Sequence, residues 1–157
     1  MQKRSLRIIC SMAVFAAVAF CADNTLGTWK LNAAKSKFPP GQSPITSLIA
    51  TREAVGDAIK TTVKGERADK SKIDVTYTTK RDGKEVAVVG SGLPYDTVAL
   101  TVVDDNTVTD VRTKKGTPYK ATGKFVVSNG GKTGTLTVTG TGADGKPTSS
   151  VSVYDKQ

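Results

Sequence analysis

The sequence contains no histidine and only two cysteines, Cys10 and Cys21, both close to its start. Histidine is the side chain best suited to general acid–base catalysis near neutral pH, and with cysteine it supplies the usual zinc ligands. Cysteine also supplies the thiolate nucleophile of many hydrolases. These absences disfavour most hydrolytic mechanisms, and we expect a protein that is not an enzyme and needs no cofactor.

The chain has one long apolar run, residues 8–22, which is too short to cross a bilayer as a helix of about 20 residues. Lys3, Arg4 and Arg7 precede the run, and small residues near its end permit cleavage. A cationic start, an apolar stretch and small residues at the cut are typical of a secretory signal peptide. We therefore expect a signal peptide over residues 1–22, a secreted or periplasmic bacterial protein, and no transmembrane segment in the mature chain.

Lipid attachment at Cys21 is an alternative to simple cleavage, because a lipoprotein signal places a cysteine at the new N-terminus. Phe20 occupies the position where such signals have a small residue, so lipoprotein anchoring is the less favoured outcome. If the cut follows Cys21, both cysteines leave with the leader and no disulfide can form. The stability of the mature chain must then come from its packed core.

Residues 23–157 have the length of a single domain, which buries about two thirds of its surface without cross-links. Removing residues 1–22 takes away three cations and no acids, leaving 20 Lys and Arg against 14 Asp and Glu, a formal charge of +6. Such a balance favours anionic surroundings only weakly. The cations are not interleaved with aromatic residues, as they are on nucleic-acid-binding surfaces, so we expect no nucleic-acid partner.

About ten segments of the chain alternate polar and apolar side chains and are separated by turn residues. This pattern predicts strands that have one solvent-exposed face and that are joined by tight turns. The Asp-Gly pair at residues 82–83 predicts a hairpin between its two flanking strands. The predicted strands are residues 24–31, 45–55, 58–63, 73–78, 85–89, 97–103, 107–113, 119–127, 133–139 and a last segment around Val151 and Val153.

The connections between these segments are short and even, which predicts that each strand pairs with its neighbour in sequence. Closing such a meander removes its exposed edges. We therefore predict an all-β fold, an antiparallel up-and-down β-barrel of about 8–10 strands. A two-sheet sandwich is the alternative; it usually contains a long crossing connection, and the longest connection here is residues 33–44.

The first predicted strand carries Gly27–Trp29, which resembles the Gly-x-Trp signature of lipocalins. In that family the tryptophan closes one end of the barrel beneath the ligand cavity, and an arginine near the last strand stacks on it. This chain has no arginine there and no helix after Tyr154. The resemblance implies a lipocalin-like barrel with Trp29 at its closed end.

A wider resemblance extends over nearly all of residues 23–157. The segments Gly27–Asn32, Lys35–Phe38, Asp96–Val98 and Val153–Gln157 are similar to a family of small secreted lipocalin-like proteins from soil bacteria such as acidobacteria. No activity is established for that family. The resemblance therefore implies export and a barrel, and it carries over no catalytic or binding residue.

Several short motifs that bind ions or phosphate in other proteins are explained here by turn geometry. Asp82–Lys84 and Asp144–Lys146 lack the dense alternating acids of a calcium loop. Gly90–Gly92 and Gly130–Thr133 precede predicted strands, whereas a phosphate loop leads into the N-terminus of a helix. We expect no metal site, and carboxylates beside strands, such as Glu66, are expected on the solvated surface.

The barrel interior is the remaining candidate site, because small barrels either fill with side chains or hold one small ligand. Ten strands leave more room for an apolar cavity than eight. The apolar and aromatic side chains expected to point inward are Trp29, Ile49, Ile59, Val63, Val75, Tyr77, Val88, Val98, Leu100, Val111, Tyr119, Phe125, Leu136 and Val138. Arg112 shares a face with Val108 and adds a polar anchor. The candidate ligand-binding residues are therefore Trp29, Tyr77, Arg112, Tyr119 and Phe125.

Two functions remain open at this stage. The first is an exported non-catalytic barrel that binds a small apolar or amphipathic ligand in its interior. The second is an envelope or extracellular interaction module with a solid core, whose cations contact an anionic envelope surface or a protein partner. The cations expected at strand ends are Lys64, Lys70, Lys72, Lys80, Arg81, Lys114 and Lys115.

Overall fold

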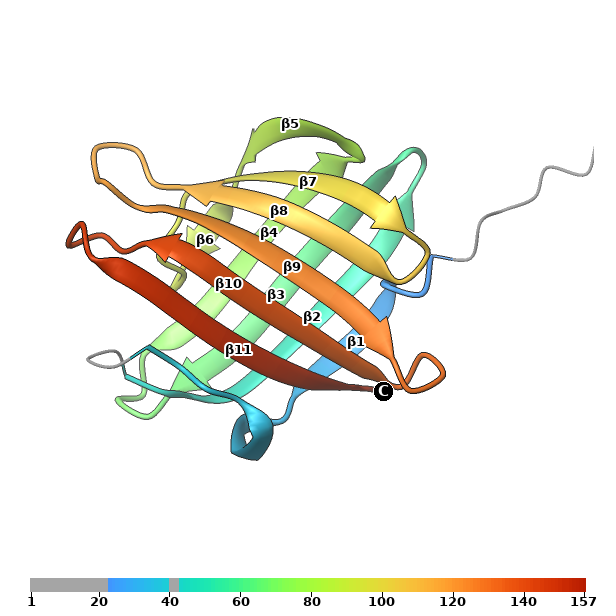
Figure 1. The fold of residues 1–157 in the computed structure, drawn as a ribbon, viewed down its shortest axis with the longest axis horizontal. Helices are drawn as coiled ribbons and strands as arrows, with labels where there is room; N and C mark the ends of the chain where they lie inside the picture. The colour runs from blue at the N-terminus through green and yellow to red at the C-terminus, as the bar shows by residue number, and fades with distance from the viewer. Residues whose placement is uncertain (1–22, 40–42) are drawn as a thin grey trace, which may run out of the picture.

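The computed structural model of the chain describes residues 23–39 and 43–157, so the predicted signal peptide and Cys21 lie outside the described residues. The described chain forms one antiparallel sheet of eleven strands that curls into a barrel (Figure 1). The strands are β1 (Gly27–Leu31), β2 (Ile45–Val55), β3 (Ala58–Arg67), β4 (Lys72–Lys80), β5 (Asp82–Ala87), β6 (Val89–Ser91), β7 (Thr97–Asp104), β8 (Thr107–Thr113), β9 (Lys120–Ser128), β10 (Thr133–Thr141) and β11 (Pro147–Lys156).

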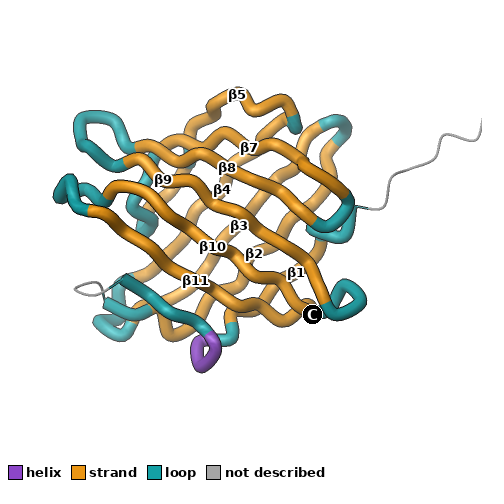
Figure 2. Tube along the Cα trace, viewed as in Figure 1, coloured by secondary structure: helices purple, strands orange, loops and turns teal. Residues whose placement is uncertain are grey.

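Helical structure in the described residues is limited to one 3-10 turn, η1 (Ala33–Lys35), in the loop between β1 and β2. The tube in Figure 2 shows strand through almost the whole wall and loops at its two ends. Within residues 23–39 and 43–157, no helix is long and apolar enough to cross a membrane.

The predicted all-β antiparallel barrel is confirmed. Strands β7 to β11 follow one another in sequence order across the sheet, β11 pairs with β1, and β1 to β4 continue the order. The first and last strands meet at Trp29, which is paired in register with Lys156. The alternation of polar and apolar residues produces this wall because successive side chains of a strand point to opposite faces.

The barrel closes through residues 82–91, and here the predicted hairpin is wrong. The predicted strand 85–89 is divided in two: β5 pairs with β7, and β6 pairs with β4. Both ends of the sheet therefore belong to one continuous stretch of chain, which changes partner near Val88. This division makes the strand count eleven.

Glycine at position 90 permits the change of partner. Gly90 has φ +113°, a conformation that side chains with a Cβ rarely adopt, and a Cβ there would lie 2.0 Å from the carbonyl oxygen of Asp74. Any larger residue would push β6 away from β4. A surface hollow lined by Thr78, Lys80 and Val86, among others, lies where β4 and β5 face each other.

Trp29 lies at one end of the main core with 1% of its surface exposed. Its indole Nε1–H donates a hydrogen bond of 3.0 Å to the carbonyl oxygen of Thr25, and its ring meets the ring of Phe125 edge to face at 5.1 Å. The Nζ atom of Lys156 lies 5.0 Å from the centroid of the indole ring. A lysine of the last strand therefore lies over the indole ring.

Two residues predicted to point inward instead face solvent. Ile49 is 47% exposed and Val111 is 40% exposed. On β2 the inward positions are those of Leu48, Ala50 and Arg52, and Ile49 lies between them. The prediction assigns both residues to the interior because they are apolar. A strand presents only every second residue to the interior, and these two lie at the outward positions of their strands.

Candidate functional site

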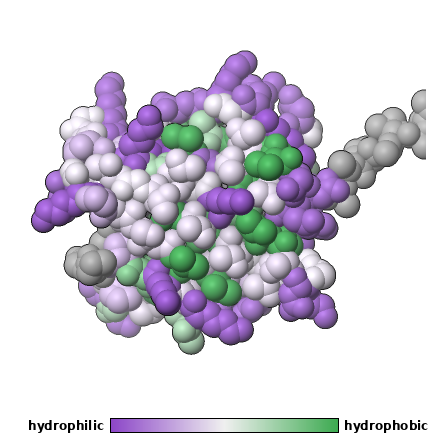
Figure 3. Space-filling view, in the orientation of Figure 1, coloured by the Kyte–Doolittle hydropathy of each residue, from purple (hydrophilic) through white to green (hydrophobic). Residues whose placement is uncertain are grey.

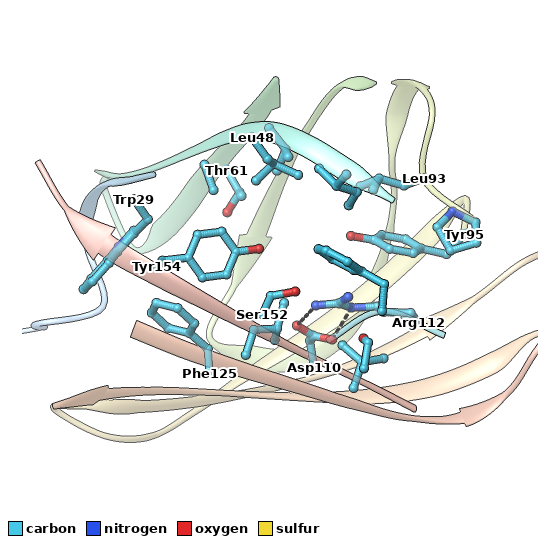
Figure 4. A pocket seen from close by; sticks show the side chains of 18 of the residues that line it. Trp29, Leu48, Thr61, Leu93, Tyr95, Asp110, Arg112, Phe125, Ser152 and Tyr154 are labelled. Atoms are coloured by element: carbon cyan, nitrogen blue, oxygen red, sulfur yellow. Dashed lines mark hydrogen bonds and ion pairs between the residues drawn. The ribbon is translucent and has the colours of Figure 1, made fainter. Parts of the chain in front are cut away.

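A cavity of about 170 Å³ lies inside the barrel (Figure 4). Much of its lining is apolar or aromatic, and a few polar side chains converge on it from opposite walls. The apolar and aromatic lining includes Trp29, Leu48, Val63, Tyr77, Tyr95, Leu100, Tyr119, Phe125, Leu136, Val138 and Tyr154. Small barrels with such linings either pack solid or hold one small ligand, and this barrel leaves space.

All five residues predicted from the sequence as ligand contacts lie in this lining: Trp29, Tyr77, Arg112, Tyr119 and Phe125. They come from β1, β4, β8 and β9 and from the loop residue immediately before β9. The fold therefore brings together side chains that are up to 96 positions apart in the sequence. Their contact with a ligand stays a prediction.

Asp110 and Arg112 form a buried ion pair in the wall of the cavity. The Nε and Nη2 atoms of Arg112 donate to the two carboxylate oxygens of Asp110 over 2.6 and 2.8 Å, shown as dashed lines in Figure 4. The two residues are alternate positions of β8, so both side chains point inward. Burial lowers the pKa of Arg112, but Asp110, Tyr95 and Tyr77 together outweigh this effect, and the net pKa is raised well above its ordinary value. Each charge of the pair therefore has its counter-charge within hydrogen-bond distance.

Tyrosine rings pack around this ion pair. The guanidinium carbon of Arg112 lies 5.0 Å from the centroid of Tyr95, whose ring stacks on that of Tyr119 at 6.4 Å. Burial raises the pKa of Tyr77, Tyr95, Tyr119 and Tyr154 above the ordinary tyrosine value. All four phenols are therefore protonated at neutral pH and can both donate and accept hydrogen bonds. Figure 4 shows the hydroxyl groups of Tyr154 and Ser152 pointing into the cavity.

Gly123 provides the space for the ion pair, which leads to the first testable prediction. It lies directly opposite Asp110 in the β8–β9 register, and a Cβ there would lie 2.5 Å from the Oδ1 atom of Asp110. We expect Gly123→Ala to lower the free energy of unfolding by about 1–3 kcal/mol, because the added methyl forces a buried pair to move. Urea denaturation followed by circular dichroism measures this change.

Thr122→Ala is the matched control, because Thr122 is the neighbouring residue of β9 and faces solvent. It should change the free energy of unfolding by less than about 0.5 kcal/mol. If the two variants lost equal amounts of unfolding free energy, the close packing of Gly123 against Asp110 would not be the cause of the loss in Gly123→Ala.

Arg67 joins two loop segments whose described residues line the cavity. Its Nη1 atom donates to the carbonyl oxygen of Ser43 over 3.0 Å, and its Nη2 atom donates to that of Gly92 over 3.1 Å. Phe38 and Leu93, one from each loop, pack against the main core and contribute to the cavity lining. One arginine therefore links the two loop segments that border the cavity.

Arg52 is the functional candidate that the sequence analysis missed. It lies on β2, lines the cavity and is 8% exposed. Its Nε and Nη2 atoms are buried and have no hydrogen-bond partner among the described residues. The sequence does contain a sign of this inward position. Arg52 lies two residues after Ala50 and four after Leu48, so strand alternation places all three side chains on one face.

Among the described residues, no group of three His, Cys, Asp or Glu side chains converges as a metal site would require. Asp110 is the one carboxylate among the described residues of the cavity lining, and Arg112 engages both of its oxygens.

No family model matches the chain, and no curated protein gives a significant match. Among solved structures, the chain is similar to a redesigned β-barrel, mFAP1, whose structure was determined bound to DFHBI. The TM-score is 0.48 with 13% sequence identity, and the match covers 87% of this chain and 98% of that chain.

Proposed function

We propose that this protein is an exported, non-catalytic barrel that binds one small amphipathic molecule in its interior. The observation that carries the proposal is the cavity itself, an apolar and aromatic space of about 170 Å³ with a few inward polar groups. A protein cavity of about 150 Å³ is large enough to bind benzene. The ligand expected here is therefore a molecule with about one ring or an equally short chain.

Apolar contact alone would bind such a molecule weakly. Burying about 200 Å² of ligand surface at roughly 25 cal/mol per Å² contributes about 5 kcal/mol, which corresponds to a dissociation constant near 0.2 mM. The tyrosine hydroxyls and charged groups of the lining supply the additional contacts and the selectivity. Export follows from the predicted signal peptide.

Native mass spectrometry of the mature protein, purified from the envelope fraction of its own organism, tests the proposal. We expect one small molecule bound per chain, which organic extraction would release and identify. A clean mass of the protein alone, together with no binding of small aromatic probes by the same sample, would overturn the proposal.

The alternative function, contact with an anionic surface, loses support from the ion pairs on the outside of the barrel. Five of the seven cations expected at strand ends lie beside acids: Lys64 with Asp74, Lys70 and Lys72 with Glu66, Lys80 with Asp57, and Arg81 with Asp23. On the face drawn in Figure 3, hydrophilic residues are spread around the outline and do not form one patch. The ion pairs reduce the local positive field that such a contact needs.

A further inference from the structure

We propose that the ligand of this cavity is a small carboxylate and that Arg52 is the residue that pairs with it. This inference rests on the proposed function, because it names the chemistry of a molecule bound in the same cavity. It is carried by an arginine that is buried in the lining without a counter-ion.

A buried arginine without a partner is unusual because the guanidinium stays charged in proteins, and an unpaired charge is costly to remove from water. Burial lowers the pKa of Arg52, and Tyr77, Asp23 and Asp110, which act in the opposite direction, only partly offset this effect. The ring of Phe125 lies 5.6 Å from the guanidinium carbon. That contact covers one face of the guanidinium and satisfies none of its N–H groups.

The two acids whose charges act on Arg52, Asp23 and Asp110, each form an ion pair with another arginine. Both oxygens of Asp110 accept from Arg112. The Oδ1 atom of Asp23 accepts from the backbone N–H and the hydroxyl of Thr25. Its Oδ2 atom lies 3.0 Å from the Nη2 atom of Arg81 and has no hydrogen-bond partner among the described residues. The described lining of the cavity thus contains three arginines, at positions 52, 67 and 112, and one acid. An anionic ligand would balance this excess.

The geometry of the free N–H groups favours a carboxylate. The Nε and Nη2 atoms form one edge of a guanidinium, and this edge fits the two oxygens of a carboxylate. Arg112 uses the same two atoms to hold Asp110 in this barrel. Arg52 leaves the equivalent edge without a partner, and the proposal requires its side chain to turn that edge toward the cavity.

Neighbouring strands add hydroxyl groups at the same level of the barrel. Thr61 is opposite Arg52 in the β2–β3 register, and Tyr77 is opposite Thr61 in the β3–β4 register. All three residues line the cavity. The three form a polar row that is suited to an anionic head group, while the ring or chain of the ligand contacts the apolar lining.

The test compares trans-cinnamate with trans-cinnamamide, two single-ring probes of nearly equal shape that differ in charge. The mature chain is titrated with each probe at pH 7 by isothermal calorimetry. We expect wild type to prefer cinnamate by about tenfold or more, and Arg52→Met to bind the two probes within about threefold of each other. Lys124→Met, which removes a cation from the exposed face of β9, should keep the wild-type preference.

Two further measurements keep the result interpretable. Arg52→Met should melt at the same temperature as wild type or higher, because it removes an uncompensated buried charge and keeps an apolar chain of similar length. Arg52→Lys keeps the charge and should keep part of the preference for cinnamate. The comparison of the two probes on wild type stands even if one variant does not fold.

The outcomes separate the two proposals. Equal affinity of wild type for both probes would overturn the carboxylate inference and leave the proposed function standing. A preference for cinnamate that persists in Arg52→Met would also overturn it, because another group would then be the anion site. No binding of either probe would overturn the proposed function and this inference with it.

Discussion

Replacing Trp29 with alanine is expected to lower the free energy of unfolding by about 3–5 kcal/mol. The indole is 1% exposed, so its removal leaves a large void at the end of the core. It also removes the hydrogen bond to Thr25 and the edge-to-face contact with Phe125. Gly134 shows how tightly this region is packed, since a Cβ there would lie 2.3 Å from the ring of Phe125.

Urea denaturation followed by circular dichroism measures this loss, because Trp29 is the one tryptophan of the chain and its fluorescence disappears with the substitution. The matched control is Ile49→Ala, a large apolar residue that is 47% exposed on β2. We expect the control to lose less than about 1 kcal/mol. A loss below about 1 kcal/mol for Trp29→Ala would contradict its place in the packed core.

Replacing Asp110 with asparagine is expected to cost about 3–5 kcal/mol of unfolding free energy, because it leaves Arg112 charged and buried without its carboxylate. The side chain of Arg112 is 11% exposed, so the unpaired charge would stay largely removed from bulk water. Asparagine has nearly the same shape as aspartate, and the loss therefore reports charge and not volume. Urea denaturation again provides the measurement.

The double variant Asp110→Asn with Arg112→Met tests the cause of that loss. Removing both charges should recover most of the stability, because a buried pair replaced by neutral groups is often close to neutral overall. A double-mutant cycle should give a coupling energy of about 2 kcal/mol or more between the two positions. Strictly additive losses would mean that the two residues stabilise the barrel independently.

These variants also separate the two kinds of arginine in the interior. Arg112 has a carboxylate within hydrogen-bond distance, and losing that partner should destabilise the protein. Arg52 has none among the described residues, so its own replacement by methionine should not. The Asp110–Arg112 pair stabilises the fold, whereas the unpaired charge of Arg52 lowers the stability of the fold. We therefore assign Arg52 to ligand binding.

The wall of the barrel was predictable because strand alternation and turn residues are properties of neighbours in sequence. The segment 97–103, for example, places Val98 and Leu100 on one face, and both are buried. The same reasoning failed at Ile49 and Val111, where a large apolar residue lies on the outer face of its strand. Alternation defines two faces of a strand, but only packing decides which face lies inside.

The sequence by itself determined an all-β chain with short connections, the alternation of two faces along each strand and the lack of histidine chemistry. Tertiary structure decided how residues 82–91 close the sheet, because β5 and β6 choose different partners across the barrel. It also decided that Arg52, on a distant strand, stays without a carboxylate, whereas Asp110 and Arg112 pair as alternate residues of one strand. Whether an ion pair forms between different strands depends on distances across the barrel, which local periodicity does not contain.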